Sequence, residues 1–240
     1  MHGGTLNVNY INNANNKSTA QGIFNLYGGT VNVTTSIGVA RDGIGIMNIE
    51  GGTITAKLLN IGLNSTAVGT VYLKGGQMVI NYDSPTASNF SIRAGSKIYI
   101  GGGLLKYNAG GLYTAADFYS FISQGKILPY GDDPRTQLNV ETVDGYIVIS
   151  SFIDDTIAAF PSPQNSGLVT DPNAVLSWTA GTAAVKHNIY FSEVRADVEN
   201  AGGRVVYLVE PVDHQVLVVE AVEVEPGPPT WLLFGSCVHF

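Results

Sequence analysis

The chain has 240 residues, which predicts one or two domains and a sizeable core. Its 29 glycines, 13% charged residues and net charge of −7 indicate a turn-rich β protein and argue against a nucleic-acid partner. The single cysteine, Cys237, excludes a disulfide framework and a cysteine metal cluster, and we expect neither a metal nor a cofactor. The sequence has no run of 18 apolar residues, so we expect no membrane span.

A repeat organises the first part of the chain. Gly-Gly pairs begin at residues 3, 28, 51, 75 and 102, so the steps are 25, 23, 24 and 27 residues. A run of alternating apolar residues lies on each side of most pairs, and a third apolar piece follows near residues 36–39, 60–63 and 91–94. Three short strands in each repeat predict an all-β fold, a right-handed parallel β-helix of about four coils over residues 1–107. An antiparallel meander is the alternative, but it does not need three strands in register in each repeat.

The alternation also predicts which side chains point inward, because successive strand residues face opposite sides. The outward columns hold Asn25, Asn48, Tyr72 and Tyr99 in one row and Tyr27, Glu50 and Lys74 in another. The glycine pairs permit the corner between two strands. The predicted inward columns are Phe24, Met47, Val71, Ile98; Leu26, Ile49, Leu73, Ile100; Val31, Ile54, Met78, Leu105; and Val33, Ala56, Ile80, Tyr107.

The repeat also carries a family resemblance. The frame Ile37-Gly38, Gly45 and Asn48-Ile49-Glu50-Gly51-Gly52-Thr53 resembles the repeat of autotransporter-type and PEP-CTERM-associated secreted proteins, and the resemblance covers residues 22–107. It implies a bacterial protein that is extracellular or on the cell surface, in a group that includes adhesins. The chain begins inside a repeat without a signal peptide or a cap for the first coil, so we expect a fragment that lacks its signal peptide and earlier coils.

A cap is predicted over residues 108–152. An insertion, Asn81 to Asn89, precedes it and is interpreted either as a tolerated loop or as a functional one. Residues 113–125 predict one helix, with Thr114 as N-cap, Asp117 at the third helical position and Gly125 as the stop. Short strands are expected at 126–130, 137–142 and 146–152. A helix laid over the last coil would cover its open edge.

Residues 153–167 are predicted to be a linker, and residues 168–240 a partial β-sandwich module. The strands around Trp178 and Tyr190 resemble the start of a fibronectin-III-like module in large secreted proteins of planctomycete-type bacteria. The resemblance covers 118–130 and 160–201 and stops there. We expect residues 202–240 either to supply unusual strands or to be translated from a shifted reading frame, with few contacts to Trp178 or Tyr190 in the second case.

Catalytic chemistry has little support in the repeat. A glycosidase needs a pair of carboxylates at a set separation, and a pectate-lyase-like enzyme needs several carboxylates for Ca²⁺. The acids of residues 1–107 are Asp42, Glu50 and Asp83, and no two share a column. We expect Asp42 in a turn and Glu50 in an exposed pair with Lys74, so we predict no catalytic residue. The four histidines, His2, His187, His214 and His239, are expected on the surface.

The outward row of Tyr72 and Tyr99 beside Asn25 and Asn48 is the candidate binding site. It is interpreted either as a strip that stacks on sugar rings or as an ordinary side-chain ladder. Our first hypothesis is a non-catalytic secreted or cell-surface repeat protein that acts as a spacer, an adhesive surface or a carbohydrate-contacting surface, with polysaccharide or cell-surface partners. The alternative is a fragment of a polysaccharide-degrading, pectate-lyase-like β-helix enzyme whose catalytic part is missing.

Overall fold

The computed structural model divides into two compact units, Met1–Asp132 with Thr136–Phe152, and Asp133–Arg135 with Ile153–Phe240. The structure describes residues 1–155 and, beyond them, seven strands at 159–162, 168–169, 175–179, 187–191, 204–209, 215–218 and 231–232.

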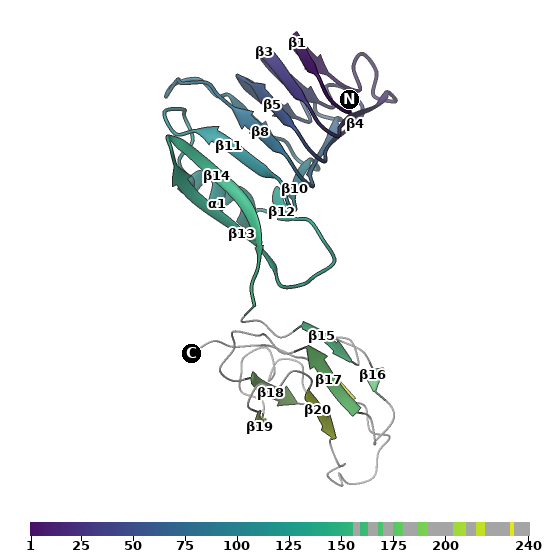
Figure 1. Cartoon of the computed structure of the whole chain (residues 1–240). Coiled ribbons are helices and arrows are strands. Elements are labelled where there is room, and N and C mark those ends of the chain that lie inside the picture. The colour runs from purple at the N-terminus through teal and green to yellow at the C-terminus, as the bar shows by residue number, and fades with distance from the viewer. Residues whose placement is uncertain are drawn as a thin grey trace. The chain divides into compact units, whose positions relative to one another are not determined.

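The first unit is the predicted parallel β-helix, with about four coils (Figure 1). Face 1 stacks five parallel strands: β2 (Gln21–Leu26), β4 (Ile44–Ile49), β7 (Val68–Leu73), β10 (Lys97–Ile100) and β12 (Ile127–Pro129). Face 2 holds β1 (Thr5–Asn12), β3 (Thr30–Val39), β5 (Thr53–Ala56), β8 (Gln77–Ile80) and β11 (Leu104–Asn108). Face 3 joins the second halves of β1 and β3 to β6 (Leu58–Ile61) and β9 (Phe90–Ile92).

The predicted inward columns are confirmed on faces 1 and 2. Met47 pairs with Val71, Ile54 pairs with Met78, and the members of these columns are buried. Phe24 is the exception and is only half-buried, because β2 is the edge strand of its sheet and Met1 pairs only with its end at Asn25 and Tyr27. The alternation of apolar and polar residues therefore specifies which side chains form the core.

Face 3 differs from the prediction by a register shift. The predicted pieces 36–39 and 60–63 align Ile37 with Ile61 when they are matched end to end, whereas Ile37 pairs with Leu59 and Val39 pairs with Ile61. A shift of two residues keeps every side chain on its original side of the strand, so Ile37 and Ile61 are still buried. The alternation predicted burial here but could not distinguish pairings two residues apart.

The glycine pairs form the corners between faces 1 and 2. Gly52 has a φ of +77°, and a Cβ atom at this position would clash with the carbonyl oxygen of Gly29 in the coil before it. Gly76 has a φ of +67°, and a Cβ atom added there would clash with the carbonyl oxygen of Gly52. Glycine is needed here both for its backbone conformation and for the close approach of neighbouring coils.

The predicted helix is α1 (Ala115–Ser123), with Thr114 as N-cap. The Asp117 carboxylate accepts hydrogen bonds from the backbone N–H of Thr114 at 2.7 Å and from its hydroxyl at 2.8 Å. These bonds lower the pKa of Asp117. At the other end, Gly125 has a φ of +66°, and its N–H and that of Lys126 donate to Ile122 and Phe121 in a Schellman motif.

The cap covers the end of the hydrophobic core. Phe118 of α1 is fully buried and packs against Phe90 and Tyr107 of the last coils, with ring centroids 5.3 Å away in both cases. Strands β13 (Thr136–Val143) and β14 (Tyr146–Ile153) form a hairpin that extends face 2, with β14 antiparallel to β11. The predicted helix-containing cap is confirmed, and Figure 1 shows α1 beside β11, β13 and β14. No helix of the described residues is long and apolar enough to cross a membrane.

The insertion of residues 81–89 is tied to the core by its last residue. Asn89 is buried, its side-chain oxygen accepts a hydrogen bond from the Tyr107 hydroxyl at 2.5 Å, and its amide donates to the carbonyl oxygen of Tyr82. Burial raises the pKa of Tyr107, whose protonated hydroxyl is the donor of this bond.

The second unit is described through its strands. They are β15 (Ala159–Ser162), β16 (Leu168–Val169), β17 (Val175–Thr179), β18 (His187–Phe191), β19 (Arg204–Val209), β20 (Gln215–Val218) and β21 (Trp231–Leu232). β15 lies within the residues predicted as a linker. β19 pairs with β18, opposite Tyr190, and β20 pairs with β17, opposite Trp178. The shifted reading frame predicts few contacts between residues 202–240 and these two strands, and the backbone pairing contradicts this. The sandwich packing expected of Trp178 and Tyr190 concerns side chains that lie outside the described residues.

Candidate functional site

The four residues predicted for binding lie in one outward column of face 1. Asn25 pairs with Asn48, Asn48 with Tyr72, and Tyr72 with Tyr99. All four side chains are half-buried, because each is flanked by its neighbours in the column. The Asn48 amide donates to the Asn25 side-chain oxygen at 2.7 Å, so the two asparagines are held as a hydrogen-bonded ladder.

The two tyrosines stack on each other. Their ring centroids lie 5.2 Å apart and their planes are 13° from parallel. One face of the Tyr72 ring and one face of the Tyr99 ring are therefore used inside the column. The two rings thus form a ladder with each other, and only their remaining surfaces are left for a ligand.

Sequence reasoning missed a third tyrosine, Tyr130. Its ring lies across that of Tyr72, with centroids 5.5 Å apart and planes at 71°. Tyr130 directly follows β12, and its backbone N–H donates to Ile100 at 2.8 Å, so β12 continues the parallel stack of face 1. The sequence predicts residues 126–130 to be a short strand of the cap. The similarity of Ile127-Leu128-Pro129 to Ile98-Tyr99-Ile100 is the sequence signal that could have placed this strand, and with it Tyr130, on face 1.

A glycine makes room for the Tyr130 ring. Gly101 follows β10 just as Lys74 follows β7, so this outward position has no side chain in one coil. A Cβ atom at Gly101 would lie 3.3 Å from Cδ1 of Tyr130. Because that space is empty, the ring packs over the backbone of Gly101 and reaches Tyr72.

These rings line a pocket of about 360 Å³. Its volume is at the lower end of the range for small-molecule sites, roughly 300 to 1,000 Å³. The pocket is aromatic on several sides and has one carboxylate residue. Its lining residues are Tyr72, Tyr99, Pro129, Tyr130, Gly131 and Asp132.

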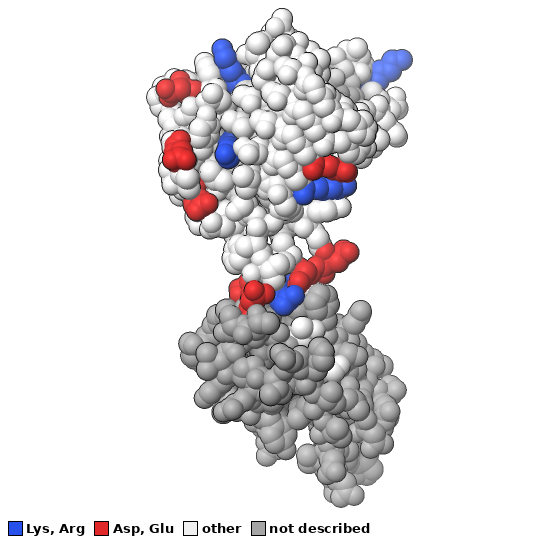
Figure 2. Space-filling view, viewed as in Figure 1, with Lys and Arg blue, Asp and Glu red and all other residues white. Residues whose placement is uncertain are grey.

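Lys74 lies beside the pocket rings but is already paired. Its Nζ atom lies 3.4 Å from Oε1 of Glu50, 5.9 Å from the centroid of the Tyr72 ring and 5.6 Å from that of Tyr130. The predicted pair of Glu50 and Lys74 is confirmed, with both side chains more than a third exposed. In the view of Figure 2, most of the visible surface of the first unit belongs to residues other than Lys, Arg, Asp and Glu.

The other acids of the coils lie apart from the pocket residues. Asp42 accepts hydrogen bonds from the backbone N–H of Asn16 at 2.8 Å and from the Asn64 amide, which joins three neighbouring loops. Asp83 lies in the insertion. Among the described residues, no group of three or more His, Cys, Asp or Glu side chains is placed to hold a metal ion. His2 stacks on Tyr27 with centroids 4.6 Å apart, and the side chains of the other three histidines lie outside the described residues.

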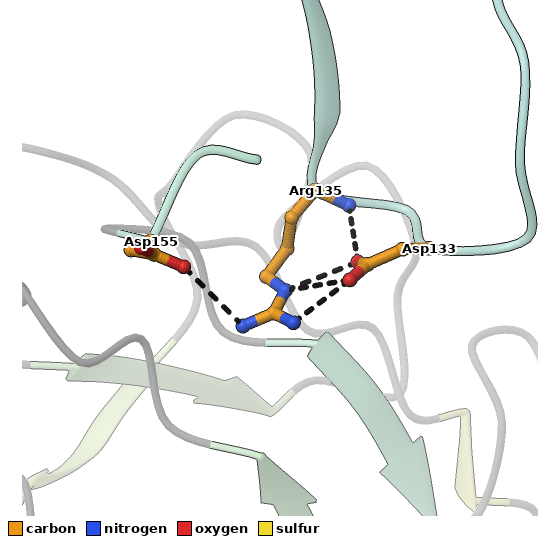
Figure 3. Close-up of polar contacts among 3 residues, drawn as sticks. All are labelled: Asp133, Arg135 and Asp155. Atoms are coloured by element: carbon orange, nitrogen blue, oxygen red, sulfur yellow. Dashed lines mark hydrogen bonds and ion pairs between the residues drawn. The ribbon is translucent and has the colours of Figure 1, made fainter. Parts of the chain in front are cut away.

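A separate charged cluster belongs to the second unit. The Arg135 guanidinium contacts Asp133 through Nη2 and Oδ2 at 2.8 Å and Asp155 through Nη1 and Oδ1 at 3.9 Å (Figure 3). Hydrogen bonds from Arg135 lower the pKa of Asp133. A carboxylate with a lowered pKa is suited to an ion pair and not to donating a proton, so this cluster joins chain segments structurally.

Comparisons with protein-family models, with curated proteins and with solved structures found no match. The two family resemblances noted in the sequence therefore stay expectations. What this chain does must be inferred from its own residues, and the pocket of face 1 is the strongest candidate site.

Proposed function

We propose that this chain is a non-catalytic secreted or cell-surface repeat protein whose β-helix is a rigid spacer with a carbohydrate-contacting surface. The observation that supports this most is the pocket of face 1, where Tyr72, Tyr99 and Tyr130 meet around a volume of about 360 Å³. A bacterial surface location rests on the resemblance of the repeat to autotransporter-type proteins.

Sugars suit this combination of groups. One side of a pyranose ring presents C–H groups that pack against an aromatic ring, while its hydroxyls need hydrogen-bond partners. Tyrosine supplies both, because its ring is apolar and its hydroxyl donates and accepts. Asp132 adds an acceptor at the pocket wall.

The β-helix supports the site by its rigidity. Tyr72 and Tyr99 project from strands whose alternate residues, such as Leu73 and Ile100, are fully buried in the core. Neighbouring strands fix the spacing of the two rings through parallel backbone pairing. Side chains mounted on such strands are held more closely in place than side chains on loops, so a ligand meets a preorganised surface.

Two of the three acids of the repeat are engaged in structural contacts. Asp42 joins loops of neighbouring coils, and Glu50 pairs with Lys74. Glycoside hydrolysis requires two carboxylates facing one bond at a separation of about 5 to 10 Å. The positions of Asp42 and Glu50 are explained without such a role, which supports binding over turnover.

The test combines binding with turnover. The purified chain is titrated with a panel of glucans, pectic polymers and alginates, and reducing ends and unsaturated products are followed in parallel. We expect saturable binding without product release, and we expect Tyr130→Ala to abolish the binding. Tyr10→Ala is the matched control, because it removes an exposed tyrosine of face 3. Turnover that is lost in Asp42→Ala or Asp83→Ala would contradict the proposal.

A further inference from the structure

We infer that the pocket of face 1 selects a neutral pyranose and rejects a uronate. This rests on the proposed function, since it specifies which sugars the same site binds. The inference comes from the charges that line and surround the pocket.

The charge within the pocket is negative. Asp132 is the one charged residue among the six that line it. A carboxylate can accept hydrogen bonds from two neighbouring hydroxyls of a sugar. The same group repels the carboxylate of a uronic acid, and the net charge of −7 for the whole chain adds to this repulsion at low salt.

The cation beside the pocket is already neutralised. Lys74 contacts the Tyr72 and Tyr130 rings, yet it does not line the pocket, and its ammonium group is 3.4 Å from the Glu50 carboxylate. A uronate would need to compete with Glu50 for this ammonium group. Glu50 therefore influences specificity without touching the ligand, because its charge offsets the positive charge of Lys74 that would attract an acidic sugar.

The shape of the pocket limits how much of a glycan it holds. The Tyr72 and Tyr130 rings are nearly perpendicular, so they form an angular wall, and Pro129 and Gly131 add a wall without long side chains. A volume of about 360 Å³ fits one or two sugar rings. The ligand is thus a short neutral segment or the end of a chain, packed by its C–H face on a tyrosine.

The test compares neutral and acidic ligands of equal length. The full chain is titrated by calorimetry with cellotetraose, maltotetraose and tetragalacturonate at low and high salt. We expect at least one neutral tetrasaccharide to bind at least about tenfold more tightly than tetragalacturonate at low salt, with a smaller difference at high salt. Tyr130→Phe, which keeps the ring, should retain most of the neutral binding, whereas Tyr130→Ala should lose it.

Two charge variants separate the inference from its alternatives. Asp132→Asn keeps an acceptor and removes the charge, so affinity for tetragalacturonate should rise about fivefold or more while neutral affinity changes less. Glu50→Gln should raise tetragalacturonate affinity in a salt-dependent way, because Lys74 is released. Circular dichroism of each variant checks that the β-helix is intact.

The outcomes distinguish the two levels of the proposal. Tetragalacturonate that binds as tightly as the neutral ligands in a Tyr130-dependent way would overturn the selectivity and leave the carbohydrate-contacting function in place. Uronate affinity that is unchanged in both charge variants would also overturn it. Failure of neutral and acidic ligands alike to bind through Tyr130 would overturn the proposed function as well.

Discussion

The inward and outward residues of face 1 follow different rules although they alternate along the same strands. The inward column of Leu26, Ile49, Leu73 and Ile100 is aliphatic in every coil and fully buried. The outward column changes from asparagine in β2 and β4 to tyrosine in β7 and β10. Packing against three faces restricts each inward side chain, whereas an outward side chain needs to suit only its neighbours in the column.

This difference shows where function can arise in a stacked repeat. Inward positions repeat because each coil must match the coils beside it. Outward positions can vary from coil to coil without loss of the fold, so a local departure from the pattern can make a site. Here the departures are Tyr72, Tyr99 and Gly101, and together with Tyr130 they form the pocket.

The largest expected effect comes from breaking the inward column. Ile49→Asp places an unpaired charge in the core and should lower the free energy of unfolding by about 4 kcal/mol or more. The matched control is Asn48→Asp, which adds the same charge one residue earlier on the outward side. Thermal or denaturant unfolding should show a much smaller loss for the control. Equal losses would mean that the assignment of inward and outward sides is wrong.

The next largest effect comes from a corner glycine. Gly52→Ala combines a positive φ with a clash against Gly29 of the coil before it, and should cost about 3 kcal/mol. Gly125→Ala is the control, because Gly125 has a similar φ with open space around it, and should cost about 1 kcal/mol. Denaturant unfolding of the two variants measures the contribution of coil stacking. Similar losses of unfolding free energy in the two variants would show that the positive φ alone, and not the clash with Gly29, accounts for the need for glycine at position 52.

The smallest effect is expected on the outward side. Glu50→Ala removes an exposed ion pair with Lys74 and should lower the free energy of unfolding by about 1 kcal/mol or less. The loss should shrink at high salt, because salt screens exposed charges. Unfolding curves at two salt concentrations measure this. A loss as large as that of Gly52→Ala would show that this outward column also carries the stability of the coil.

Local patterns were enough to predict much of the first unit. The Gly-Gly period predicted the coils, and the alternation predicted burial at positions such as Ile54 and Met78. The capping residues Thr114 and Asp117 and the stop at Gly125 predicted α1, because helix ends are decided by residues close in sequence. The same local reasoning placed Ile37 beside Ile61, two residues from its true register.

The candidate site was predicted only in part. The column of Asn25, Asn48, Tyr72 and Tyr99 follows from the repeat, because residues one period apart become neighbours when coils stack. The stacking of the Tyr72 ring on the Tyr99 ring depends on the conformations of the two side chains. The sequence pattern does not contain these.

The sequence by itself determined the coil, its corners and the direction of each side chain, since these depend on strand alternation and on glycine conformation within one repeat. The similarity of residues 127–129 to residues 98–100 could have placed β12 on face 1, but tertiary structure alone decided that Tyr130 packs over Gly101 against Tyr72. The physical reason is distance along the chain. Tyr130 and Tyr72 are separated by the whole of α1 and more than one coil, so no local pattern relates them, and only the packing of the cap on the last coil brings them together.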